Sequence, residues 1–234
     1  MLNQKRKTKT MKKFAMFVGL ALVMLATSCS TDTTEVNLNG AKVTLGVSLD
    51  QTRTYMGELN NGEYPVLWSD GDKLLVNDKV VAVPAEYVGK ASVQVAVDAA
   101  EAYNVAYPAE LILGNELTIS EVQKYAEGSF AVGSGVMVGY STSADAVALK
   151  NLYGYLKFTV TGAANVNAVT VVAAGGEAIS GTYAIDYKNA TITPLAGKDI
   201  IRVTEVVAKD GVATVVVAVP AGEYSKGFEV KVKD

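Results

Sequence analysis

The sequence contains no histidine and only one cysteine, and these absences exclude much of the chemistry that protein sites commonly use. Without histidine, a Ser-His-Asp or Cys-His nucleophile and a His-ligated zinc site cannot form. A single thiol excludes an intramolecular disulfide and a cluster held by several cysteines. Carboxylate chemistry of the glycosidase kind stays open, but no pair of acids stands out. We therefore expect no enzyme activity, no metal site and no cofactor.

Basic residues are scarce once the first 13 residues are set aside. Six of the 21 Lys and Arg residues lie there, which leaves 15 against 24 acidic residues and a formal charge of −9 for the rest of the chain. A surface of that sign repels polyphosphate. The sequence therefore predicts no nucleic-acid partner.

The one cysteine follows a short apolar run. Lys12 and Lys13 precede apolar residues 14–26, and the small residues 26–28 lead directly to Cys29. The run is shorter than the ~20 residues of a membrane span, and its layout is typical of a secretory signal. We predict a lipoprotein signal peptide over residues 1–28 and lipidation at Cys29, which would anchor the protein to a membrane. An ordinary signal with a chance cysteine is the alternative.

Residues 29–40 are polar and lack periodicity, so we expect a lipidated tether. Within them, Asp32-Thr33-Thr34 resembles an O-glycosylation motif of bacteria that are rich in such lipoproteins. Thr33 is the candidate acceptor, and a plain solvated linker is the alternative.

The rest of the chain has the patterns of β-strands. Val43, Leu45, Val47 and Leu49 alternate with polar or small residues, which predicts a strand with one buried face. The same period recurs at 93–97, 156–160, 183–187 and 228–232, whereas 215–219 is a continuous apolar run, typical of a strand covered on both faces. Many short strands between Gly, Asn and Asp turns predict an all-β fold of antiparallel β-sandwiches.

Three smaller features are also predicted from the residues. Trp68 is expected in the core, and Gly175-Gly176 is expected to form a hairpin turn. Residues 120–126 are the one expected helix, because Ser120 and Gln123 have the spacing of a capping box.

Several landmarks along the chain resemble the fimbrillin family, the lipoprotein precursors of type V pili. Thr52-Arg53-Thr54, followed by Trp68 and then Gly71-Asp72, is similar to the family's N-terminal domain, and residues 103–108, 136–140, 151–158 and 219–224 resemble later landmarks in the same order. The resemblance implies two transthyretin-like β-sandwich domains, at 41–142 and 146–234. It also implies a lipid-anchored protein of the cell outer membrane, exposed on the surface as part of a fimbrium.

The resemblance further implies assembly by strand donation. In that family, an arginine-specific protease cuts after the first strand, and a segment of the next subunit fills the groove that is left. Arg53 is the only arginine between the signal and Arg202, and it follows the first predicted strand. Arg53 and Thr54 therefore flank a candidate processing site. An arginine that only pairs with a carboxylate is the alternative.

The partners implied are other fimbrial subunits through strand exchange, the membrane through the lipid at Cys29, and a host protein or glycan as the target of adhesion. An uncut protein would be an anchor subunit or a stand-alone surface lipoprotein that binds a glycan or a protein. The sequence departs from the family where it stops at Asp234, directly after a strand. Either the second sandwich is incomplete or the sequence is a fragment.

Overall fold

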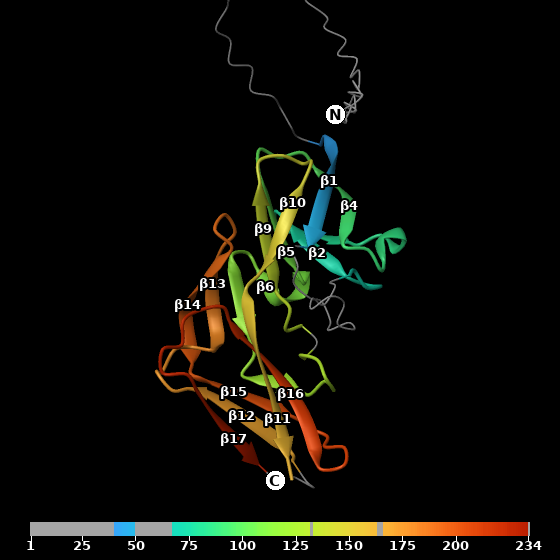
Figure 1. Cartoon of the computed structure of the whole chain (residues 1–234). Helices are drawn as coiled ribbons and strands as arrows, with labels where there is room; N and C mark the ends of the chain where they lie inside the picture. Colours follow the sequence, from blue (N-terminus) through green and yellow to red (C-terminus); the bar gives the residue numbers. More distant parts are fainter. Residues whose placement is uncertain (1–39, 50–66, 132, 163–165, 234) are drawn as a thin grey trace, which may run out of the picture. The chain divides into compact units, whose positions relative to one another are not determined.

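The computed structural model describes residues 40–49, 67–131, 133–162 and 166–233, and it confirms the all-β, sandwich-type fold (Figure 1). Besides its strands, this part of the chain has two three-residue 3-10 helices, Ala85–Tyr87 (η1) and Ala109–Leu111 (η2). Among these residues no helix is long and apolar enough to cross a membrane. The strands form four sheets.

The largest sheet has seven strands in the order β3-β2-β5-β9-β10-β1-β4. Their bounds are β1 Lys42–Leu49, β2 Lys73–Val76, β3 Lys79–Ala82, β4 Ser92–Asp98, β5 Tyr103–Tyr107, β9 Met137–Ser141 and β10 Val147–Asn151. The turn from β2 to β3 is two residues long, and Asn77 and Asp78 both have positive φ, as a tight hairpin with right-handed twist requires. Asn77 also ties this hairpin to β5, because its side chain accepts a hydrogen bond from the backbone N–H of Asn104.

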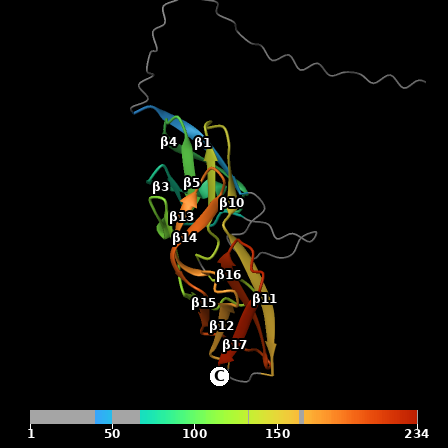
Figure 2. The same ribbon diagram turned by 90° about the vertical axis from the view of Figure 1, so that its left-hand side faces the viewer.

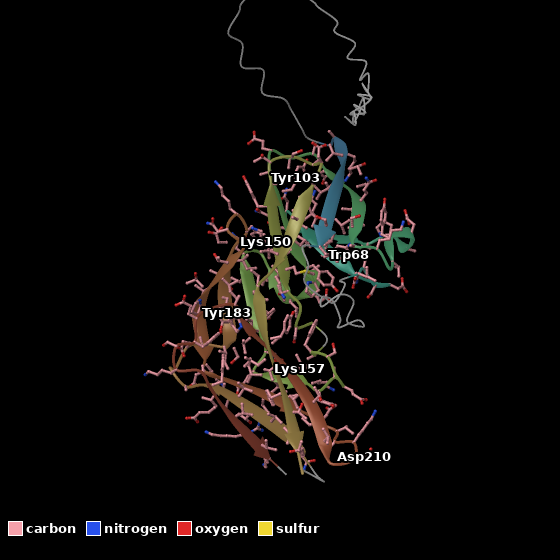
Figure 3. The ribbon with its side chains drawn as sticks, viewed as in Figure 1. Trp68, Tyr103, Lys150, Lys157, Tyr183 and Asp210 are labelled. Atoms are coloured by element: carbon pink, nitrogen blue, oxygen red, sulfur yellow. The ribbon has the colours of Figure 1, made fainter. Side chains whose placement is uncertain are left out.

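The seven-stranded sheet curls around a core of its own. Strands from distant positions in the sheet supply the same apolar cluster, which includes Leu45 of β1, Leu74 of β2 and Val95 of β4. Trp68, labelled in Figure 3, belongs to this cluster and is 1% exposed, as the sequence predicts. Lys79 of β3 forms an ion pair with Asp98 of β4, so the two edge strands approach each other.

The other three sheets are smaller. A two-stranded sheet pairs β11 (Tyr153–Thr161) with β16 (Val212–Pro220). A second has the order β17-β12-β15-β8, with bounds Phe228–Lys233, Ala168–Ala173, Ile200–Thr204 and Val122–Lys124. A third has the order β14-β13-β7-β6, with bounds Thr191–Lys198, Ser180–Asp186, Glu116–Ile119 and Ile112–Leu113.

Continuous apolar runs occur where a strand is covered on both faces. Val217 of β16 packs in a cluster with the β12 and β15 side chains, while the next residue, Ala218, packs with Tyr183 in another. Leu74 and Leu75 of β2 divide in the same way between the first core and the second. The predicted continuous strand at 215–219 is confirmed, and its composition reflects this two-sided burial.

Strand pairing crosses the expected boundary at 142–146 in both directions. β10 lies beyond that boundary in the sequence, yet it pairs with β1 and β9. β7 and β8 lie before it, yet they pair with β13 and β15. β10 leads into β11 after a single residue, Leu152, and Figure 2 shows β11 beside β16.

The helix expected at 120–126 is wrong, because residues 122–124 form strand β8. The hydroxyl oxygen of Ser120 accepts the N–H of Val122 at 3.1 Å, two residues on, in place of a helix cap. β8 runs parallel to β15, and this pairing with a distant strand outweighs the local helix signal. The expected hairpin at Gly175-Gly176 is a turn, but it joins β12 to β13, which lie in different sheets.

Gln123 of β8 fixes β8 to β16 through its side-chain amide. Its Nε2 donates to the carbonyl oxygen of Ala218 at 2.8 Å, and its Oε1 accepts the Ala218 N–H at 3.2 Å. The residue is 5% exposed, so water cannot replace these bonds. The amide thus satisfies a buried stretch of backbone as a neighbouring strand would.

We predict that Gln123→Met lowers the free energy of unfolding by about 2–4 kcal/mol, because it leaves two buried backbone groups of Ala218 without partners. Urea denaturation followed by tryptophan fluorescence measures the change. Gln94→Met, on the exposed face of β4, is the matched control and should change stability by less than about 0.5 kcal/mol. Equal effects of the two substitutions would contradict this role of Gln123.

Candidate functional site

The candidate site is strand β1 together with the two strands that flank it. β1 is antiparallel to β4 from Lys42 opposite Asp98 to Ser48 opposite Ser92. On its other side it is parallel to β10, with Val47 opposite Val147 and Leu49 opposite Leu149. β1 is therefore an interior strand of the sheet, although it is the first strand of the described chain.

The apolar face of β1 is buried as the alternation predicts. Leu45, Val47 and Leu49 are 0%, 1% and 9% exposed and pack in the core of the curled sheet. Burial of each such side chain contributes about 1.5–3 kcal/mol to the stability of the folded protein. Removal of β1 would therefore expose an apolar groove whose floor is formed by the other side chains of this core.

The same removal would also leave backbone groups unpaired. β4 is hydrogen-bonded to β1 alone among the described strands, and the first half of β10 is paired with β1. An open row of N–H and C=O groups beside uncovered apolar side chains favours addition of another strand. The arrangement is therefore suited to exchange of one strand for another.

Gly46 sets a steric condition on any strand in this place. A Cβ at this position would lie 2.5 Å from the carbonyl oxygen of Asp145, and the Gly46 N–H donates to the carbonyl oxygen of Ala144 at 3.0 Å. The loop before β10 thus lies directly against β1. Only glycine permits this close approach without a shift of the backbone.

Three charged side chains hold the N-terminal end of β1. The Lys42 ammonium lies 2.5 Å from one carboxylate oxygen of Asp98, and the Lys79 ammonium contacts the other. These lysines lower the pKa of Asp98 from 3.8 to about 2. One carboxylate therefore joins β1, β3 and β4, a cluster that the sequence analysis did not identify. The only signal for it is an acid at the end of an alternating strand.

A groove of about 490 Å³ opens beside this cluster, between the outer edges of β3 and β4. Val80, Val81 and Val97 supply its apolar walls, and the charged cluster lies at one end. The groove shows that β4 has open space along the edge that faces away from β1.

The residues that the sequence singled out for modification lie outside the described part of the chain. These are Cys29 for lipidation, Thr33 for O-glycosylation, and Arg53 with Thr54 for proteolytic processing; the signal peptide over 1–28 and most of the tether also lie there. Among residues 40–49, 67–131, 133–162 and 166–233, no three His, Cys, Asp or Glu side chains come together as metal ligands would.

Comparison with known proteins adds little. No protein-family model and no curated protein matches the chain. Among solved structures it is similar to a candidate cell adhesion protein from Bacteroides ovatus, with 11% identity, a TM-score of 0.48, and coverage of 83% of this chain and 84% of that one. It is also similar to a DUF3823 family protein from the same species, with 12% identity, a TM-score of 0.22, and coverage of 82% and 91%. These values support neither a family nor a shared activity.

We predict that Gly46→Ala lowers the free energy of unfolding by about 1–3 kcal/mol, because the added methyl group forces β1 away from Asp145. Gly154→Ala in β11 is the matched control, since a Cβ there meets nothing within 4 Å. That control should be neutral or slightly stabilising. Urea denaturation of both variants measures the difference, and an equal response would show that the close approach at Gly46 is unimportant.

We predict that Asp98→Asn flattens the loss of stability in acid. Because the pKa of Asp98 is lower in the folded protein than in the unfolded chain, its contribution is present above about pH 4 and lost as the pH falls towards 2. The stability difference between wild type and variant should therefore shrink over that range in urea denaturation. Glu86→Gln, at an exposed site on η1, controls for the general loss of a negative charge. A difference that is constant with pH would contradict the prediction.

Proposed function

We propose that this protein is a lipid-anchored outer-membrane protein exposed on the cell surface, a structural or anchor subunit of a fimbrium that assembles by β-strand donation and supports adhesion. The role is non-enzymatic. The observation that carries the proposal is the place of β1, which precedes Arg53 in the chain and lies between β4 and β10 with its apolar face in the core. A cut after Arg53 would separate β1 covalently from both flanking strands.

The geometry defines what an incoming strand must supply. It must pair antiparallel with β4 and parallel with β10 if it runs in the direction of β1. It needs apolar residues at the three positions of Leu45, Val47 and Leu49. At the position of Gly46 it needs glycine, unless the loop at 144–145 moves. These requirements favour one kind of segment over a generic extended peptide.

The alternative is a stand-alone surface lipoprotein that binds a glycan or a protein. It shares the lipid at Cys29 with the first proposal, but β1 then stays covalently attached and in place. The state of the chain at Arg53 therefore distinguishes a structural subunit from the stand-alone protein, and the presence of multimers distinguishes an uncut anchor subunit from it.

For a structural subunit, we predict that protein recovered from the cell surface begins at Thr54 and carries no lipid, as mass spectrometry of the N-terminus would detect, whereas an anchor subunit keeps the lipidated Cys29 terminus. Arg53→Gln should keep the lipidated Cys29 terminus and abolish detergent-resistant multimers. Arg202→Gln is the matched control and should change neither result, because Arg202 is held in β15 between β12 and β8. Multimers built from wild-type chains that still begin at lipidated Cys29 would overturn strand donation after this cut.

A further inference from the structure

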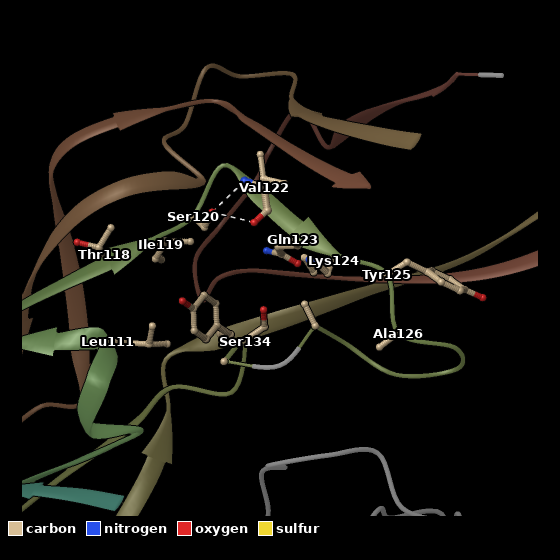
Figure 4. Close-up of a pocket in the computed structure, with 13 residues that line it drawn as sticks. Leu111, Thr118, Ile119, Ser120, Val122, Gln123, Lys124, Tyr125, Ala126 and Ser134 are labelled. Atoms are coloured by element: carbon tan, nitrogen blue, oxygen red, sulfur yellow. Dashed lines mark hydrogen bonds between the residues drawn. The ribbon is translucent and has the colours of Figure 1, made fainter. Parts of the chain in front are cut away.

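A second feature of the molecule is a cavity of about 400 Å³, distant in sequence from β1 (Figure 4). It is lined by the end of β7, by β8 and the residues after it, by residues 131, 133 and 134, and by Tyr153 at the start of β11. Its volume lies within the range of small-molecule sites in proteins. The cavity belongs neither to the β1 site nor to the groove between β3 and β4.

Two buried hydroxyl groups in the cavity lack hydrogen-bond partners. Tyr153 and Ser134 are 7% and 8% exposed, and neither side-chain oxygen is hydrogen-bonded within the part of the chain that the structure describes. Hydroxyl groups this far from bulk water normally have a partner. Both residues line the cavity. Both groups are therefore free to bond a molecule in the cavity.

The other buried polar group of the lining is already occupied. Both ends of the Gln123 amide are bonded to Ala218, and the Ser120 hydroxyl group bonds the backbone of Val122, as the dashed lines in Figure 4 show for Ser120. These bonds fix the β8 wall of the cavity. The site is thus rigid on one side and keeps its unused donors and acceptors on Tyr153 and Ser134.

The charge of the lining favours a neutral ligand. Lys124 is the one ionic side chain among the residues that line the cavity, and its ammonium lies 3.3 Å from Glu205 with 77% of the side chain exposed. Burial raises the pKa of the Tyr153 hydroxyl above its ordinary value, so this group stays protonated and uncharged. Among the described residues that line the cavity, none supplies a buried charge to pair with an ionic ligand.

We propose that this cavity binds a neutral sugar ring, with Tyr153 and Ser134 hydrogen-bonded to its hydroxyl groups. Leu111 and Ile119 supply apolar walls for the C–H faces of the ring. A hydroxyl group donates and accepts at once, which matches the hydroxyl groups of a sugar. The inference goes beyond the fimbrial role and holds whether or not Arg53 is cut.

Saturation-transfer NMR on the full chain tests the proposal, with glucose, galactose, mannose and N-acetylglucosamine as separate probes. The protein is kept in a detergent without a sugar headgroup, so that the detergent does not compete. We expect at least one of the four to bind. Tyr153→Phe and Ser134→Ala should each weaken that binding by about 3- to 10-fold, the effect of one lost hydrogen bond.

Tyr140→Phe is the matched control, because this tyrosine is 36% exposed on β9 and outside the cavity. It should leave the affinity unchanged, and thermal unfolding checks that all three variants are folded. The proposal is overturned if none of the four sugars binds, or if binding persists unchanged in both Tyr153→Phe and Ser134→Ala.

Discussion

Every strand in this protein must satisfy two demands at once, a cover for its apolar face and partners for its backbone edges. β1 meets both through its neighbours, since β4 and β10 take its edges and the curled sheet covers Leu45 and Val47. β4 depends on β1 in turn, because β1 is its one hydrogen-bonded neighbour among the described strands. The stability of this sheet therefore depends on an occupied place between β4 and β10. Another strand of suitable sequence could fill that place.

The side-chain amide of Gln123 supplies hydrogen-bond partners to a buried backbone edge in place of a strand. Ala218 lies in β16, which is paired with β11 alone among the described strands, so the backbone on its other side would be buried without a bond. The Gln123 side chain supplies both a donor and an acceptor to that residue. A buried amide is as good a partner as a peptide group here, and it also binds the short edge strand β8 to the rest of the fold. β8 has only three residues, and pairing with β15 alone would be a weak constraint on it.

Local patterns in the sequence predict where the strands lie, but they do not predict which strands pair with each other. The alternation at 43–49 and at 93–97 gives β1 and β4 with the correct buried faces, because a half-buried strand needs only its own period of two. The parallel partner of β1 is β10, about 100 residues further on, and no local signal marks that choice. The expected helix at 120–126 failed for the same reason, since distant residues decide the conformation of β8.

The candidate sites were predictable to different degrees. An arginine after the first strand is visible in the sequence, and so is the cysteine after the signal, but both lie outside the described residues. The ion pair between Asp98 and Lys79 needs the curl of the sheet, which brings β3 to β4. The cavity is lined by four separate stretches of the chain, and Ser134 and Tyr153 meet only in the folded protein. No sequence motif marks either arrangement, because each depends on contacts between residues that are far apart in the chain.

The two sites are close along β10 and β11, yet the pairing of β10 separates them. β1 is paired with residues 147–149, whereas β9 is paired with residues 150 and 151. Both backbone groups of Leu152 are also bonded, its N–H to Val136 at 2.9 Å and its carbonyl oxygen to the Ala221 N–H at 2.8 Å. Removal of β1 would free the first half of β10 and leave the half next to Tyr153 fixed. Exchange of a strand at one site would therefore leave the shape of the cavity at the other unchanged.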